Sequence, residues 1–363
     1  MKQFFESWRS FTNLNEGGNK SLKTRGVVLS PELVKKTVAV YENVITDWNK
    51  WLESQGEQPV KALRPVGSVS YYEKDLEEKP GTVYGDIDYL VEFPLASEAE
   101  DDTAKRKEQN AQKRKYTQLF VDYLNSGTVS PEVDVEETLK GNVLLVILQL
   151  SEGVYVQADT VITFPDYSEW MGGRYTPERG IKGYATGHLY TSLGSFFPLS
   201  IGTEGVIART QDGNLVTGKV RKGVQIKTIS TDPRNFLIDI AKYFAGEDVS
   251  IEPILTKNSG IDPEAVSIER FAEGIKGLAL TLDQAGITNG NAMIQHVKDT
   301  YKAKLQGSAD EKEQMAAKKE ASLRDQGYDE GYIKNFLREE EKGLLKILEV
   351  NKKAYDLFLR GIS

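Results

Sequence analysis

The feature that most constrains the fold is a pair of β-type runs in residues 142–165, NVLLVILQLSEGVYVQADTVITFP. The runs flank Ser151-Glu152-Gly153, a turn-forming stretch that predicts a β-hairpin. The first run is apolar throughout, which predicts a strand buried on both faces. The second run alternates, and its polar face carries Tyr155, Gln157, Asp159 and Thr163. The chain must therefore build a sheet with a carboxylate on one face.

A second acidic strand lies earlier, in the stretch PVGSVSYYEKDLEEKPGTVYGDIDYLVEFP from Pro65 to Pro94. Residues 60–94 predict strand, loop, strand, and Asp86 and Asp88 share one face because side chains alternate along a strand. Two adjacent carboxylates repel unless they lie at an exposed strand end or a hard cation neutralises them. If this strand neighbours the one with Asp159, three carboxylates converge. Three carboxylates can hold two Mg²⁺ ions for an in-line displacement at phosphorus.

Gly67 and Ser68 follow the first strand of this region and fit the same chemistry. A glycine after an apolar strand allows a phosphate to approach the backbone. A serine adds a hydroxyl and an N–H donor. The pair alone is a weak signal, and its ordered combination with the three acids is stronger.

The composition narrows the alternatives. The chain of 363 residues has no cysteine and two histidines, which excludes thiolate chemistry and a His-rich metal site, so carboxylates must hold any metal. The net charge of -8 argues against nonspecific coating of nucleic acid. No apolar run approaches the roughly 20 residues of a membrane span, and we expect no membrane association.

The ordered set Gly67-Ser68, Asp86-Ile87-Asp88 and Asp159 resembles the DNA polymerase β-type nucleotidyltransferase superfamily. The resemblance covers residues 30–165, including the order of helix, strand, strand, helix and hairpin. It implies that Asp86, Asp88 and Asp159 are catalytic and bind two Mg²⁺ ions, and that Asp159 helps to activate the acceptor hydroxyl. It also implies that Gly67 and Ser68 hold the β- and γ-phosphates of an NTP such as ATP.

Two departures from that family stand in the same region. The spacer between Ser68 and Asp86 is longer than usual and contains an insertion, YYEKDLEEKPGT in residues 71–82. The insertion is either a lid over the nucleotide or a sign that Gly67-Ser68 is not the phosphate loop. Thr160 follows Asp159 where the family usually has an apolar residue.

The rest of the chain predicts an α+β protein: a polymerase β-like core with a mixed sheet and helices, then a β-rich segment, then a helical C-terminal region. Ser30-Pro31-Glu32 predicts a helix start, and the helix should end near Gly56. Residues 100–127 predict another helix, and Asp212-Gly213 predicts a hairpin turn. The expected domains are a targeting helix (1–16), a linker (17–29), the core (30–165), a β-rich subdomain (166–232) and a helical domain (233–363).

Basic residues gather in two places. Residues 165–235 carry more basic than acidic side chains, interleaved with tyrosines, and this favours either a site for a triphosphate or an RNA end, or an ordinary surface. We assign Lys182 of this segment to nucleotide binding. The Lys and Arg residues of 105–115 predict a solvated helix face.

The N-terminal stretch MKQFFESWRSFTNLNEGG is similar to capsid-targeting propeptides of internal head proteins of contractile-tailed bacteriophages. Its Phe4, Trp8 and Phe11 predict an amphipathic helix, and Leu14-Asn15-Glu16 before Gly17 matches the cleavage pattern of a prohead protease. The alternatives are a helix that packs on the protein's own core and a peripheral membrane helix. The resemblance implies packaging in the capsid interior and delivery into the host cytoplasm.

Together these patterns predict a Mg²⁺-dependent nucleotidyltransferase. It would transfer a nucleoside monophosphate from an NTP to an RNA 3′ end such as tRNA, or to a hydroxyl of a host protein, and release pyrophosphate. The alternative is a catalytically inactive internal head protein with a structural or packaging role.

Overall fold

The computed structural model describes most of the chain beyond the N-terminal segment. The described residues are 29–84, 87–95, 101–135, 138, 144–174, 178–216, 224–262, 264 and 266–363. They form two compact units. The first unit contains the described residues up to 174 and those of 203–232, and the second contains 178–202 and 233–363. The predicted targeting helix (1–16) and nearly all of the linker lie outside the described residues.

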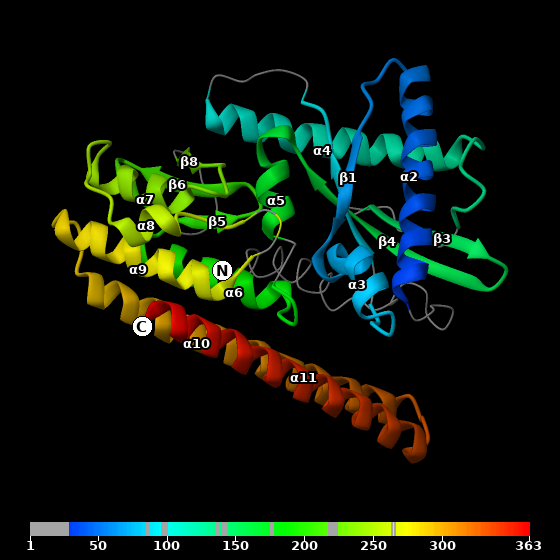
Figure 1. Ribbon diagram of the computed structural model, residues 1–363. Helices are drawn as coiled ribbons and strands as arrows, with labels where there is room; N and C mark the ends of the chain where they lie inside the picture. The colour runs from blue at the N-terminus through cyan, green and yellow to red at the C-terminus, as the bar shows by residue number, and fades with distance from the viewer. Residues whose placement is uncertain are drawn as a thin grey trace. The chain divides into compact units, whose positions relative to one another are not determined.

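The first unit is organised around a mixed four-stranded sheet (Figure 1). Its strands are β1 (Lys61–Val66), β2 (Ile87–Glu92), β3 (Leu144–Ser151) and β4 (Val154–Thr163), in the order β1-β2-β4-β3. β2 and β4 are parallel, whereas the two outer pairs are antiparallel. The predicted hairpin is confirmed, and Gly153 takes a φ of 75° at its turn, a conformation that glycine adopts without steric cost.

Two long helices cover one face of this sheet, α2 (Pro31–Ser54) and α4 (Asp102–Asn125). α2 begins as predicted, because the Ser30 hydroxyl accepts a hydrogen bond from the Leu33 N–H at 3.3 Å. Trp48 of α2 packs edge-on against Phe93 and against Phe120 of α4, with ring centroids 6.2 and 4.9 Å apart. Aromatic burial therefore fixes both helices on the same face.

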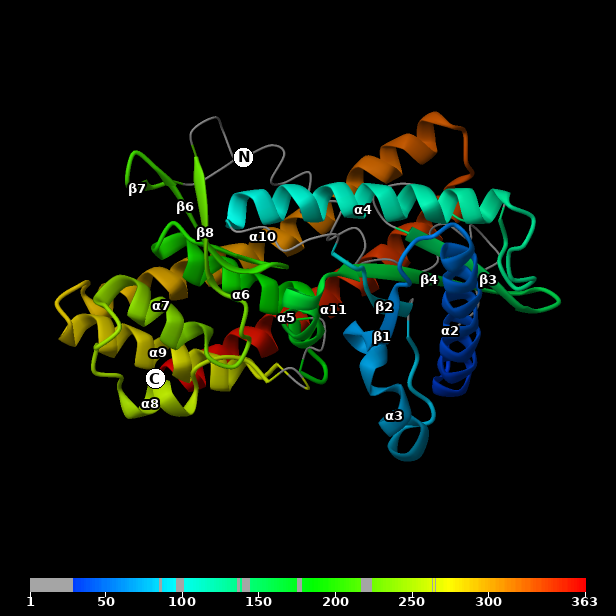
Figure 2. The same cartoon turned by 90° about the horizontal axis from the view of Figure 1, so that it is seen from above.

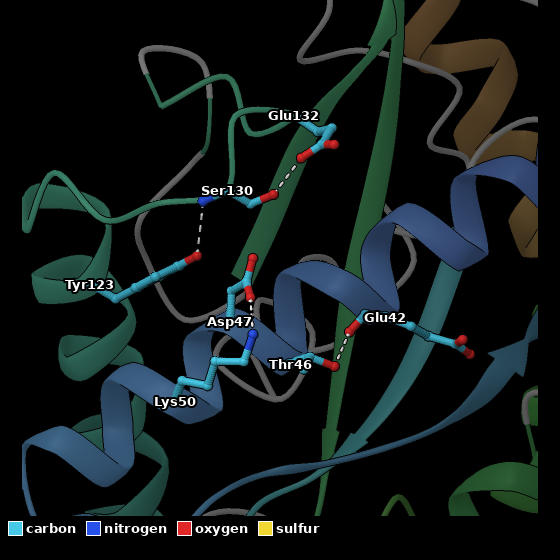
Figure 3. A network of polar contacts seen from close by, with 7 residues as sticks. All are labelled: Glu42, Thr46, Asp47, Lys50, Tyr123, Ser130 and Glu132. Atoms are coloured by element: carbon cyan, nitrogen blue, oxygen red, sulfur yellow. Dashed lines mark hydrogen bonds and ion pairs between the residues drawn. The ribbon is translucent and has the colours of Figure 1, made fainter.

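Polar contacts fix the connection between α4 and β3. The Tyr123 hydroxyl accepts a hydrogen bond from the Ser130 N–H at 3.1 Å, and the Ser130 hydroxyl donates to Glu132 (Figure 3). The Gln149 N–H of β3 donates to the Glu132 carbonyl at 2.7 Å. This segment thus runs along the β3 edge of the sheet and pairs with its backbone.

The predicted insertion (71–82) is structured: it contains α3 (Tyr72–Glu78), which directly follows the 3-10 helix η2 (Gly67–Tyr71). α3 packs against α2. The Tyr84 hydroxyl donates to the buried Asp75 carboxylate at 2.5 Å, and the Tyr84 N–H donates to the Leu29 carbonyl at 2.9 Å. The insertion is therefore anchored on α2, the helix that covers one face of the sheet.

Residues 166–232 are less β-rich than predicted, since they include α5 (Ser168–Arg174) and α6 (Gly183–Phe196). In the first unit, β6 (Gly205–Gln211) pairs antiparallel with β7 (Asn214–Leu215) and with β8 (Gln225–Ser230). The predicted turn is confirmed, with φ of 51° at Asp212 and 79° at Gly213. α6 was missed because its many Gly, Ser and Thr residues are poor helix formers, and burial stabilises it instead.

The second unit is helical apart from the short β5 (Ser200–Gly202). Its other elements are α6, α7 (Phe236–Ala245), α8 (Pro253–Lys257), α9 (Ile268–Gln284), α10 (Gly290–Asp325) and α11 (Glu330–Ile362). Tyr190, Phe236 and Phe271 meet in its core. The helical C-terminal region is thus as predicted. Within the described ranges, no helix combines the length and apolar character that crossing a membrane requires.

Candidate functional site

The sheet brings two of the predicted acids together. Asp88 of β2 and Asp159 of β4 are direct partners in the parallel register. Adjacent strands lie about 4.8 Å apart, and partner residues share a face. Both side chains therefore lie on the face opposite to the one that Tyr89 shares with Tyr41 of α2. Two carboxylates at this spacing can bind one cation.

Asp159 is almost completely buried, with 2% of its surface exposed. Its Oδ1 accepts a hydrogen bond from the Gln157 amide at 2.8 Å, whereas its Oδ2 has no hydrogen-bond partner. The Gln157 Oε1 is also buried without a partner. A buried acceptor oxygen without a partner lowers folding stability. A hydrogen-bond donor or a cation bound at this strand face would satisfy both oxygens.

Burial raises the pKa of Asp159 from 3.8 to about 6, and the hydrogen bond from Gln157 opposes this shift. The cause is desolvation, which disfavours the charged carboxylate. Asp159 therefore holds a proton far more readily than an ordinary aspartate. A pKa close to neutrality is suitable for a group that accepts a proton during a reaction.

The third predicted acid, Asp86, lies outside the described residues, immediately before the described start of β2 at Ile87. Among the described residues, no group of three or more His, Asp or Glu side chains is arranged to hold a metal ion. The carboxylate oxygens of Asp88 and Asp159 are ligands of the type that Mg²⁺ prefers. Asp88 and Asp159, with Asp86, are the residues that would hold it.

Gly67 and Ser68 lie beside the start of β2. Val66, the last residue of β1, is the register partner of Asp88, so Gly67 follows directly at the acidic end of the sheet. Gly67 has a φ of 71°, in the left-handed region that glycine adopts freely, and Ser68 is exposed. The turn thus presents the exposed Ser68 at the end of β1 whose last residue pairs with Asp88.

The unusual Thr160 after Asp159 is accommodated by a specific partner. Thr160 is 4% exposed, and its hydroxyl lies 2.5 Å from the hydroxyl of Tyr41 in α2. The Thr160 hydroxyl is therefore not left as an unsatisfied polar group in the core.

Lys182 lies in the second unit, as the residue before the first turn of α6, where its carbonyl accepts from the Ala185 N–H at 3.0 Å. Its assignment to nucleotide binding stays a prediction. Gln157 belongs to the candidate site because its amide donates to Asp159. The sequence pattern places Gln157 and Asp159 on the same strand face but does not by itself indicate this hydrogen bond.

The sequence matches no model of a known protein family and no curated protein.

Proposed function

We propose that the chain is a Mg²⁺-dependent nucleotidyltransferase. It transfers a nucleoside monophosphate from an NTP to an acceptor hydroxyl and releases pyrophosphate. The observation that carries the proposal is the register pairing of Asp88 with Asp159, whose Oδ2 is buried and unpartnered. A buried carboxylate with an unpartnered oxygen costs folding stability, and groups of this kind are concentrated at functional sites.

The proposed roles follow from position. Asp86, Asp88 and Asp159 would hold Mg²⁺, which would supply charge stabilisation at the phosphate oxygens. Gly67 and Ser68 bind the β- and γ-phosphates at the end of β1. The acceptor oxygen bonds to the α-phosphorus while the bond to the bridging oxygen breaks and pyrophosphate leaves. Asp159 receives the acceptor's proton as the general base.

The test is incorporation of label from each NTP into total host RNA or host lysate, in the presence of Mg²⁺. We expect Asp88→Ala and Asp159→Ala each to lower incorporation by about 10²-fold or more, as for the loss of an electrostatic stabiliser. Asp122→Ala, on the exposed side of α4, is the matched control and should retain activity. RNase and protease treatment of the labelled product distinguishes an RNA 3′ end from a protein acceptor.

Absence of incorporation with every NTP and acceptor would overturn the proposal and favour the inactive head protein. Incorporation that survives Asp88→Ala and Asp159→Ala would contradict the assigned site. Both variants must first show the circular dichroism spectrum and unfolding midpoint of a folded chain.

We further propose that the protein is packaged in a phage head and delivered with the virion. The support is the N-terminal resemblance alone, in residues outside the described ranges. Mass spectrometry of virions should find a chain that starts at Gly17. Absence of the protein from virions would contradict packaging.

A further inference from the structure

A group of basic side chains lies on α4 and β6 of the first unit, which carry neither Asp88 nor Asp159. The first half of α4 runs beside β6 and β8, while its second half lies near α2 (Figure 2). The Thr228 N–H of β8 donates to Asp102 at 2.6 Å, which fixes the helix start against this small sheet. Arg106, Lys113 and Arg209 gather there around Glu204. We call these four residues the basic cluster.

The helix face of the cluster is not the solvated face that the sequence predicts. Arg106, Gln109 and Lys113 follow one another at spacings of three and four, so they share one side of α4. The Arg106 side chain is 11% exposed and Gln109 is 3% exposed. In contrast, Lys107 and Arg114 are exposed. Arg106 and Lys113 thus point toward the protein, and their neighbours point toward solvent.

Hydrogen bonding in the cluster is incomplete. The Arg106 Nη1 donates to the Glu204 carboxylate, but its Nε and Nη2 are buried without a partner. The Nε of Arg209 is buried without a partner as well. Unpaired guanidinium N–H groups in buried surroundings are costly, since they lose water and gain no acceptor.

The charges of the cluster do not balance. Glu204 is the carboxylate that interacts with all three cations in the part of the chain that the structure describes. Asp166 forms a separate ion pair with Lys105 at 2.6 Å. Burial lowers the pKa of Lys113, and burial together with Arg106 lowers the pKa of Arg209. Like charges at close range repel, and an added anion would relieve this repulsion.

We propose that the basic cluster is a binding site for a terminal phosphate group, with Arg106, Arg209 and Lys113 as its ligands. The planar fork of an Arg side chain matches phosphate oxygens in a bidentate manner. Three cations against one carboxylate leave an excess positive charge that a phosphate dianion neutralises. The near-complete burial of Arg106 selects a compact terminal group over a phosphodiester inside a strand.

This site is separate from the proposed catalytic site. Burial raises the pKa of Tyr167, and Arg106 and Glu204 of the cluster interact with it electrostatically; Tyr167 follows the end of β4. Asp159 lies within β4, eight residues earlier in the chain. The proposal therefore does not depend on nucleotidyl transfer. The phosphate can belong to a free ion or nucleotide, or to the 5′ end of a nucleic acid strand.

The test is isothermal titration calorimetry of the full chain with inorganic phosphate in EDTA, which removes any metal-dependent binding at the carboxylates. We expect Arg106→Met and Arg209→Met each to weaken phosphate binding about tenfold or more, because each removes charged hydrogen bonds. Arg114→Met is the matched control on the exposed side of α4 and should bind as the wild type does.

Glu204→Gln separates a binding role from a merely structural one. It removes the carboxylate that competes with phosphate for Arg106, so phosphate should bind severalfold more tightly to this variant. A structural ion pair predicts a less stable protein with no gain in phosphate affinity. Glu204→Gln also keeps the test decisive if an arginine variant fails to fold.

Oligonucleotides with a 5′-phosphate or a 5′-hydroxyl distinguish the sources of the phosphate. Tighter binding of the 5′-phosphate form assigns the site to a strand end, whereas binding of inorganic phosphate or a nucleoside monophosphate alone assigns it to a small molecule. The proposal is overturned if the wild type binds no phosphate, or if Arg106→Met, Arg209→Met and Arg114→Met all bind it equally.

Discussion

The side-chain amide of Gln157 donates a hydrogen bond to Oδ1 of Asp159 at 2.8 Å, and Oδ2 of the same buried carboxylate has no partner. The two residues lie on one face of β4, where Asp88 is the register partner of Asp159 from β2. A carboxylate held by one donor in a desolvated position is costly when it is charged. Folding stability must therefore depend on the protonation of Asp159.

The first prediction concerns pH. The folded-state pKa of Asp159, about 6, lies above its ordinary value of 3.8. Protonated Asp159 therefore favours the folded state below about pH 4, and this contribution is lost as the pH rises to about 6. Asp159→Asn, which stays neutral, should be more stable than the wild type above pH 6, by about 3 kcal/mol at most because one pKa unit corresponds to about 1.4 kcal/mol.

Urea unfolding at pH 4, 5, 6, 7 and 8 in EDTA measures this difference. Asp122→Asn, at the exposed Asp122 of α4, is the control and should not change the slope of stability against pH. A constant difference between Asp159→Asn and the wild type across the range would contradict the prediction.

The second prediction concerns Mg²⁺. A cation that binds the folded state stabilises it in proportion to the logarithm of its concentration above the Kd. At pH 8 we expect Mg²⁺ to raise the Tm of the wild type and to have little effect on Asp88→Asn or Asp159→Asn. Differential scanning fluorimetry with and without Mg²⁺ measures the shift. An equal shift in all three proteins would place the cation elsewhere.

The third prediction concerns the hydroxyl pair of Tyr41 and Thr160, both of which are buried. Tyr41→Phe leaves the Thr160 hydroxyl unsatisfied and should cost about 1–3 kcal/mol in free energy of unfolding. Thr160→Val leaves the Tyr41 hydroxyl unsatisfied in the same way. The double variant removes both groups and should recover much of the loss, which a double-mutant cycle of unfolding free energies measures. Strictly additive losses would show that the two hydroxyls do not interact.

Local patterns predicted the parts of the fold that depend on neighbours in sequence. The Ser30 cap, the hairpin turn at Gly153 and the face shared by Gln157 and Asp159 follow from side-chain periodicity and turn chemistry. The pairing of Asp88 with Asp159 could only be hypothesised, because the register between distant strands is set by packing of the whole sheet.

The burial of Arg106 could not be predicted for a related reason. A run of Lys and Arg residues on a helix is usually solvated, and its sequence does not show which members face a neighbouring element. The contacts of α4 with β8 decide this, and β8 lies more than a hundred residues later in the chain. Only the tertiary structure therefore shows that Nε and Nη2 of Arg106 are buried without a hydrogen-bond partner.

The fourth prediction compares two helical glycines of the second unit. A β-carbon on Gly274 of α9 would lie 2.1 Å from the Asn258 carbonyl oxygen, whereas a β-carbon on Gly307 of α10 would meet nothing within 4 Å. Gly274→Ala should therefore force the backbone near Asn258 to move and cost about 1–3 kcal/mol. Gly307→Ala should stabilise the protein by about 0.5–1 kcal/mol, since alanine is the better helix former. Thermal unfolding of both variants measures the opposite signs, and a stabilising Gly274→Ala would show that α8 and α9 are less closely packed than the structure indicates.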